Sequence, residues 1–120
     1  MQEYIALTDT TSVDDLIEAS RERPQVIFKH STSCSISHLA KARMDRALRG
    51  DELALPVHYL DLLAHRQVSN YVAERLGVRH ESPQAIVVAD GEARYAASHL
   101  DIDPYALVPV RGTGAQDEGA

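Results

Sequence analysis

The chain has 120 residues, which is enough for one compact domain with a core and too few for two. It carries 12 lysines and arginines against 18 aspartates and glutamates, and this net charge of −6 opposes non-specific binding to nucleic acid or to an anionic membrane surface. No apolar stretch is long enough to span a bilayer, and the first residues lack the features of a signal peptide, so we expect a cytoplasmic protein. The single cysteine excludes an internal disulfide and a multi-cysteine zinc site within one chain.

The first part of the chain predicts a strand, a helix and a second strand. Residues 4–7 are a short apolar run that fits a strand, and Ser12 is the predicted cap of the helix that follows. The buried stripe of this helix consists of Val13, Leu16 and Ile17. Residues 25–30 then predict a strand, and its β-branched and aromatic side chains at 26–28 are typical of a strand buried on both faces.

A polar turn at residues 31–33 leads from this strand to Cys34, which we expect at the start of a second helix. The buried stripe of the second helix consists of Ile36, Leu39, Ala40, Met44, Ala47 and Leu48. Serine and threonine in the turn have side chains that can cap a helix. Unpaired backbone N–H groups converge at a helix N-terminus, and together with the helix dipole they favour a thiolate there. We therefore predict that Cys34 is a nucleophilic, redox-active thiol.

The remaining predicted elements are a strand over 55–61, a helix over 65–76, strands over 84–89 and 92–97, and a helix over 104–108. Asp90-Gly91 predicts the two-residue turn of a hairpin, and Asp103 can cap the last helix. The resulting order, β-α-β-α-β-α-β-β-α, predicts an α/β fold with a mixed central sheet and helices on both faces. We expect the domain to span residues 1–110 and residues 111–120 to form a disordered tail.

This element order, with a reactive cysteine opening the helix after the second strand, resembles the thioredoxin fold. Four segments carry a narrower resemblance: FKHSTSCSIS at 28–37, RQVSN at 66–70, GVRHESPQ at 77–84, and Ser98-His99. They resemble the monothiol bacilliredoxin family, also called YtxJ-like bacillithiol-system proteins. The resemblance covers about residues 10–108 of the chain.

The resemblance implies a Cys-x-x-Ser active site in which Cys34 is the nucleophile and Ser37 occupies the position of a resolving cysteine. It also implies that Pro83 is a cis-proline facing the cysteine, and that the preceding Ser82 offers backbone hydrogen bonds to a docked thiol substrate.

One departure from the family pattern lies beside the sulfur. Relatives commonly have a proline directly after the cysteine, whereas this chain has Ser35 there. A serine restores an N–H group and adds a hydroxyl at the start of the helix. We expect this change to shift the redox poise of the thiol rather than to abolish activity, and we place Ser33 and Ser35, on either side of Cys34, among the substrate-binding residues.

A lone cysteine cannot close an intramolecular disulfide, so a redox cycle must pass through a mixed disulfide with another molecule. In the family interpretation, Cys34 attacks a bacillithiol mixed disulfide or the disulfide of the small thiol itself, and a second thiol then releases it. The expected partners are bacillithiolated proteins and small thiols, with bacillithiol or a similar low-molecular-weight thiol as co-substrate and no tightly bound cofactor or metal. Lys29, Arg66 or a charged histidine would suit the carboxylates of bacillithiol.

Two other functions compete with this interpretation. A single cysteine can serve an iron–sulfur carrier together with an external thiol, but the chain lacks the Cys-Gly-Phe-Ser motif of such carriers. The domain can also be an interaction module in which Cys34 is silent, since a lone cysteine is often a small buried hydrophobe. Among the histidines, His30 can tune the thiol or hold structure, and we interpret His80 and His99 as structural hydrogen-bonding residues near the site.

Overall fold

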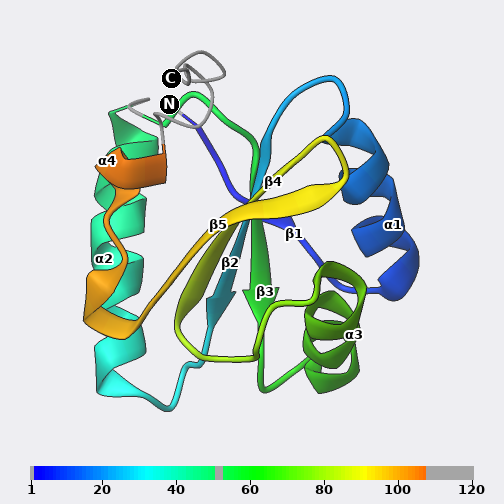
Figure 1. Cartoon of the computed structure of the whole chain (residues 1–120). Coiled ribbons are helices and arrows are strands. Elements are labelled where there is room, and N and C mark those ends of the chain that lie inside the picture. The colour runs from blue at the N-terminus through cyan, green and yellow to red at the C-terminus, as the bar shows by residue number, and fades with distance from the viewer. Residues whose placement is uncertain (1, 51–52, 108–120) are drawn as a thin grey trace.

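A five-stranded sheet forms the centre of the computed structural model, which describes residues 2–50 and 53–107. In chain order the elements are β1 (Ile5–Ala6), α1 (Thr10–Ala19), β2 (Gln25–His30), α2 (Ser35–Arg49), β3 (Val57–Asp61), α3 (Arg66–Leu76), β4 (Gln84–Ala89), β5 (Glu92–Ser98), the 3₁₀ helix η1 (His99–Asp101) and α4 (Pro104–Leu107). The strand order across the sheet is β1-β3-β2-β4-β5. This confirms the predicted α/β order, to which the structure adds η1 (Figure 1).

The sheet is mixed, and the pairing of its middle strand, β2, determines which loops lie at the same edge of the sheet. β2 pairs in parallel with β3 and antiparallel with β4, and β4 pairs antiparallel with β5. The carboxyl ends of β2 and β3 and the start of β4 therefore meet at one edge of the sheet, at the bottom of Figure 1. Three connections leave this edge: the turn into α2, the loop into α3 and the loop before β4.

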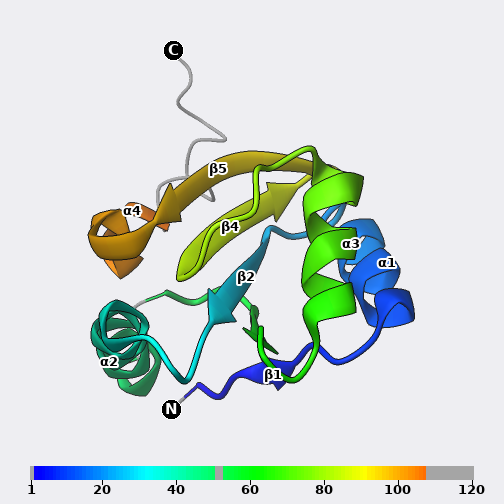
Figure 2. The same cartoon turned by 90° about the horizontal axis from the view of Figure 1, so that it is seen from below.

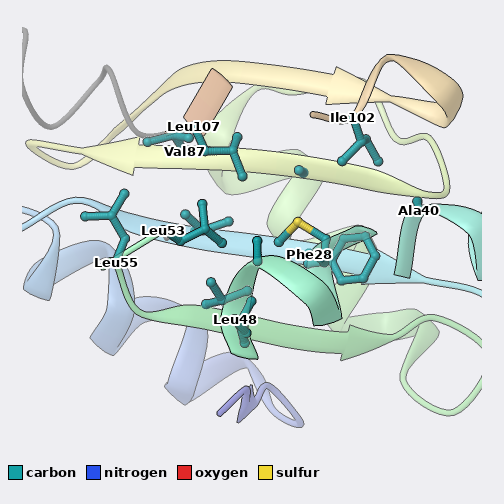
Figure 3. Close-up of a cluster of buried hydrophobic side chains, with 13 residues drawn as sticks. Phe28, Ala40, Leu48, Leu53, Leu55, Val87, Ile102 and Leu107 are labelled. Carbon is teal, nitrogen blue, oxygen red and sulfur yellow. The ribbon is translucent and has the colours of Figure 1, made fainter. Parts of the chain in front are cut away.

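Different helices cover the two faces of the sheet, as predicted. Helices α2 and α4 lie on one face, while α1 and α3 lie on the other (Figure 2). Phe28 belongs to the apolar cluster beneath α2, together with Leu48 and Val87 (Figure 3), and Ile27 belongs to the cluster beneath α1 and α3. Since successive side chains of a strand point to opposite faces, β2 supplies both clusters.

All six residues of β2 are buried, which confirms the prediction of a strand covered on both faces. The last two residues are polar: Lys29 has no exposed surface and His30 is 1% exposed. Because burial of polar groups is costly unless they are hydrogen-bonded, both side chains require partners in the interior. Alternation along the strand directs them to opposite faces of the sheet.

The helix and turn ends agree with the prediction except at the first helix. The expected cap, Ser12, is wrong: Asp9 is the N-cap, and its carboxylate accepts a hydrogen bond from the Ser12 N–H at 2.7 Å. Asp90 and Gly91 have φ values of 54° and 80°, as the predicted hairpin turn requires. The carboxylate of Asp103 accepts from the Tyr105 N–H at 3.0 Å, which confirms its capping role.

The predicted end of the last helix at Val108, the domain limit at residue 110 and the tail at 111–120 lie outside the described residues. Within the described ranges, none of the helices combines the length and the apolar character needed to cross a bilayer.

Candidate active site

Cys34 lies at the junction between β2 and α2, where the prediction placed it. It is the N-cap residue of α2, with extended backbone angles of φ −115° and ψ 126°. Its N–H donates to the Ser31 carbonyl at 3.2 Å, and its carbonyl accepts the first helical hydrogen bond from the His38 N–H at 3.2 Å. Its side chain makes no capping hydrogen bond and is partly exposed. The thiol is therefore accessible and lies at a helix start whose N–H groups have no side-chain cap.

Ser37 is buried directly behind this junction. Its Oγ accepts a hydrogen bond from the Ser31 N–H at 2.9 Å and lies 2.9 Å from His30 Nδ1. Ser37 has no exposed surface. The hydroxyl at the position of a resolving cysteine thus ties the first turn of α2 to the end of β2.

Two histidines pack beside this hydroxyl. The rings of His30 and His38 meet edge to face with centroids 5.3 Å apart, and His38 Nε2 donates to the Thr32 carbonyl at 2.9 Å. Burial, followed by the charges of His38 and Lys41, lowers the pKa of His30, so its neutral form is favoured. His38, although exposed, therefore holds the turn, and His30 is a buried neutral hydrogen-bonding group.

The loop before β4 reaches the same edge of the sheet. The Ser82–Pro83 peptide bond is cis, as the resemblance implied, and the Pro83 carbonyl accepts a hydrogen bond from the His99 N–H at 2.9 Å. Gln84 pairs with Lys29 across β2 and β4, so Pro83 lies beside the end of β2, from which the turn to Cys34 departs. The hydroxyl of Ser82 is buried and has no hydrogen-bond partner among the described residues.

Lys29 and Arg66, the two predicted cationic docking residues, lie in different environments. Arg66 is exposed at the first residue of α3. Lys29 is enclosed instead of facing solvent: its Nζ donates to the Ser69 carbonyl at 3.3 Å and lies 3.2 Å from His80 Nδ1. Burial lowers the pKa of Lys29 to about 8. The cysteine turn and the cis-proline loop thus lie at the same edge of the sheet. Lys29 is buried and does not reach the surface there.

The remaining predicted site residues lie around the cysteine turn and the cis-proline loop. Ser33 and Ser35 are exposed on either side of Cys34, and the Ser33 hydroxyl lies 3.2 Å from the Ser31 hydroxyl. The cis-proline loop lies at the same edge of the sheet. His30, whose role the prediction left open, and His80, which the sequence predicted to be a structural hydrogen-bonding residue, both make hydrogen bonds around this edge. Their signal in the sequence was polar side chains at the end of an apolar strand and before a proline.

Comparison with known proteins agrees with this geometry. A family model described as monothiol bacilliredoxin BrxC matches residues 5–107. A solved structure described as a candidate oxidoreductase with a thioredoxin fold is 28% identical, with a TM-score of 0.76, and the match covers 91% of this chain and 93% of that one.

More distant solved structures share the fold alone. Thioredoxin from Trypanosoma brucei brucei is 10% identical with a TM-score of 0.70, and the match covers 92% of this chain and 90% of that one. A mutant thioredoxin from Halobacterium salinarum is 17% identical with a TM-score of 0.66, and the match covers 92% and 89%. With a family match over most of its length, a single accessible cysteine at a helix start and a thioredoxin fold, the chain belongs to the monothiol bacilliredoxins, a family of thioredoxin-like thiol oxidoreductases.

Proposed function

We propose that this protein removes bacillithiol, or a similar low-molecular-weight thiol, from the cysteines of other proteins. The observation that carries the proposal is the position of Cys34: a partly exposed thiol at the start of α2, with no second cysteine in the chain. The membership of the family supports it, because a monothiol enzyme must exchange thiols with its partners. A free cysteine that has to be reduced for each cycle suits the cytoplasm.

The proposed reaction has two steps, each of which exchanges one disulfide for another. The Cys34 thiolate attacks the bacillithiol sulfur of a protein mixed disulfide, a new S–S bond forms on Cys34, and the protein cysteine leaves as a thiolate. A second low-molecular-weight thiolate then attacks the disulfide on Cys34. The small thiol leaves with it as a symmetrical disulfide, and the Cys34 thiolate is restored.

The residues around Cys34 have separate roles in this proposal. Ser37 holds the turn from inside and cannot resolve the mixed disulfide, since it has no thiol. Exposed Ser33 and Ser35 flank the incoming sulfur, and the backbone of Ser82 offers hydrogen bonds to the docked thiol. Arg66, exposed at the start of α3, attracts the carboxylates of the small thiol.

The test is intact-mass analysis of the wild-type protein and Cys34→Ala after incubation with bacillithiol disulfide. We expect the wild type to gain the mass of one bacillithiol and to lose it when a small thiol is added, whereas Cys34→Ala gains nothing. In a second assay, a bacillithiolated test protein should recover its free cysteine only with the wild type. Glu22→Gln, which keeps the cysteine and changes an exposed side chain in the turn after α1, is the matched control.

Two results would contradict the proposal. Absence of an adduct on the folded wild type would favour the silent interaction module. Visible cluster absorbance after anaerobic purification, lost in Cys34→Ala, would favour the iron–sulfur carrier.

A further inference from the structure

His80 and Lys29 form a hydrogen-bonded pair beneath the cis-proline loop. Lys29 Nζ lies 3.2 Å from His80 Nδ1, and the hydroxyl of Ser69 lies 3.3 Å from the same nitrogen. Lys29 has no exposed surface, and its other hydrogen bond goes to the Ser69 carbonyl. Among the described residues, no carboxylate lies within ion-pairing distance of this ammonium. The imidazole thus meets a buried positive charge without a counter-ion.

This contact decides which nitrogen of His80 carries the proton. An ammonium only donates hydrogen bonds, so Nδ1 opposite Lys29 must be an acceptor, and the Ser69 hydroxyl can donate to it as well. The neutral imidazole then carries its hydrogen on Nε2. Burial lowers the pKa of His80, and the charges of Lys29 and Arg66 lower it further, with Glu81 opposing them. The ring is therefore held as a neutral donor through Nε2.

His80 comes just before the cis-proline loop, and, within residues 2–50 and 53–107, its Nε2 donor is free to bind a ligand. His80 is exposed as a residue, and within the described part of the chain its Nε2 has no hydrogen-bond partner. Two residues later comes Ser82, and the loop between them is fixed: the Gln84 side chain donates to the Arg79 carbonyl at 3.0 Å, and the Pro83 carbonyl accepts from the His99 N–H at 2.9 Å. The positive charge of Arg66 acts on the ring, which favours an anionic acceptor over a neutral one.

We propose that His80 recognises the substrate by donating a hydrogen bond from Nε2 to a carboxylate of the small thiol, and that Lys29 is the positioning residue that fixes the proton on that nitrogen. The inference rests on the proposed function, whose substrate is a low-molecular-weight thiol with carboxylates. It assigns Lys29 an indirect role in place of direct contact with the ligand, in agreement with its burial.

The first test reads the tautomer without any substrate. Long-range ¹H–¹⁵N NMR spectra of the folded protein at neutral pH, with His80 assigned through His80→Gln, should show the Nε2–H tautomer of His80. In Lys29→Met the ring should shift toward a mixture of tautomers, and its pKa should rise. Lys41→Met, which removes the other lysine of the chain, should leave the His80 signals unchanged. A purely structural Lys29 would not move this spectroscopic signature.

The second test compares two disulfides, one with carboxylates and one without. For bacillithiol disulfide, His80→Phe should lower kcat/KM about tenfold, the value of one hydrogen bond to a charged group at the low end of its range. For bis(2-hydroxyethyl) disulfide, the same variant should stay within roughly twofold, because this substrate has no carboxylate to bind. His80→Gln keeps a donor near Nε2 and should recover most of the lost activity. Lys29→Met should show part of the same selective loss.

The outcomes separate this inference from the proposed function. If His80→Phe slows both disulfides equally or neither, or if His80 carries its proton on Nδ1 in the wild type, the inference is overturned while the proposed function stands. If the wild-type protein exchanges with neither disulfide, the proposed function fails and the recognition role of His80 fails with it.

Discussion

Ser37 shows at the scale of one residue how the site is held without a second cysteine. Its buried hydroxyl serves the Ser31 N–H and His30 Nδ1, both at 2.9 Å. In Ser37→Ala these two groups lose their partner in the interior, and a buried polar group left unpaired costs about 1–3 kcal/mol. We therefore expect urea denaturation to show a free energy of unfolding lower by about 2 kcal/mol than in the wild type.

Ser33→Ala is the matched control, because Ser33 is exposed and, among residues 2–50 and 53–107, its hydroxyl hydrogen-bonds only with that of Ser31. Its free energy of unfolding should stay within about 0.5 kcal/mol of the wild type. Equal stability of Ser37→Ala and Ser33→Ala would show that the network around His30 does not stabilise the fold.

The sequence predicted individual residues well where their partners are local and poorly where they are distant. Cys34 and the Asp90-Gly91 turn could be placed because a few neighbouring residues decide their conformation. Lys29 could not, since its partners Ser69 and His80 lie 40 and 51 residues further along the chain. A lysine at a strand end is ordinarily exposed, and only tertiary structure reveals that this one is enclosed.

The start of α2 has Ser35 at the position where the resemblance to the family implied a proline. Ser35 is its first residue, and the first N–H groups of a helix have no partner within the helix. Cys34 is already in the extended conformation that a following proline requires. Ser35→Pro therefore restricts the unfolded chain without straining the folded one and should raise the free energy of unfolding by about 0.4–1 kcal/mol.

Ser35→Ala removes the same hydroxyl but keeps the backbone N–H, so it isolates the effect of the proline ring. Urea denaturation of both variants should rank Ser35→Pro as the more stable. The opposite order would mean that the Ser35 N–H has a role at this helix start that proline cannot fill.

The boundary of a helix or strand was predictable where one residue or turn marks it, and was not predictable where several neighbouring residues could mark it. β2 was predicted with its observed bounds, because an apolar run follows a proline and ends in a polar turn. The cap of α1 was missed because Asp9, Thr10, Thr11 and Ser12 can all cap a helix. With Asp9 as the cap, the helix is about one turn longer than predicted. The hydrophobic periodicity of the helix begins only at Val13, so it gives no sign of this first turn.

At the scale of the whole molecule, the sheet separates two buried clusters that differ in their polar content. The face under α2 is an apolar cluster that supports the cysteine turn, while the face under α1 and α3 contains a buried ammonium at its edge. The fold was predictable because the alternation of strands and helices leaves few ways to cover both faces. The sequence did not predict which face would support the cysteine turn and which would hold the buried ammonium. This depends on the side of β2 to which each polar side chain points.

Burial of the Lys29 ammonium makes the stability of the whole molecule change with pH in the alkaline range. Lys29 has its pKa lowered from 10.5 to about 8 by burial, so between these values the unfolded chain binds a proton that the folded protein has released. Stability rises with pH wherever the unfolded state holds more protons. The free energy of unfolding of the wild type, relative to that of Lys29→Met, should therefore increase by about 1–2 kcal/mol between roughly pH 7 and 9.5.

The wild type must be compared with Lys29→Met at each pH, because two tyrosines also make stability depend on pH. Burial raises the pKa of Tyr4 and Tyr59 in the folded protein. These tyrosines therefore ionise first in the unfolded chain, which lowers the stability of both proteins at still higher pH. Arg94→Met, a change at a surface cation paired with Asp90 and Glu92, should give a curve parallel to that of the wild type. Urea denaturation at intervals across this range measures all three proteins. Parallel curves for the wild type and Lys29→Met would contradict the lowered pKa of Lys29, because a pKa that is the same in the folded and unfolded states gives no dependence of stability on pH.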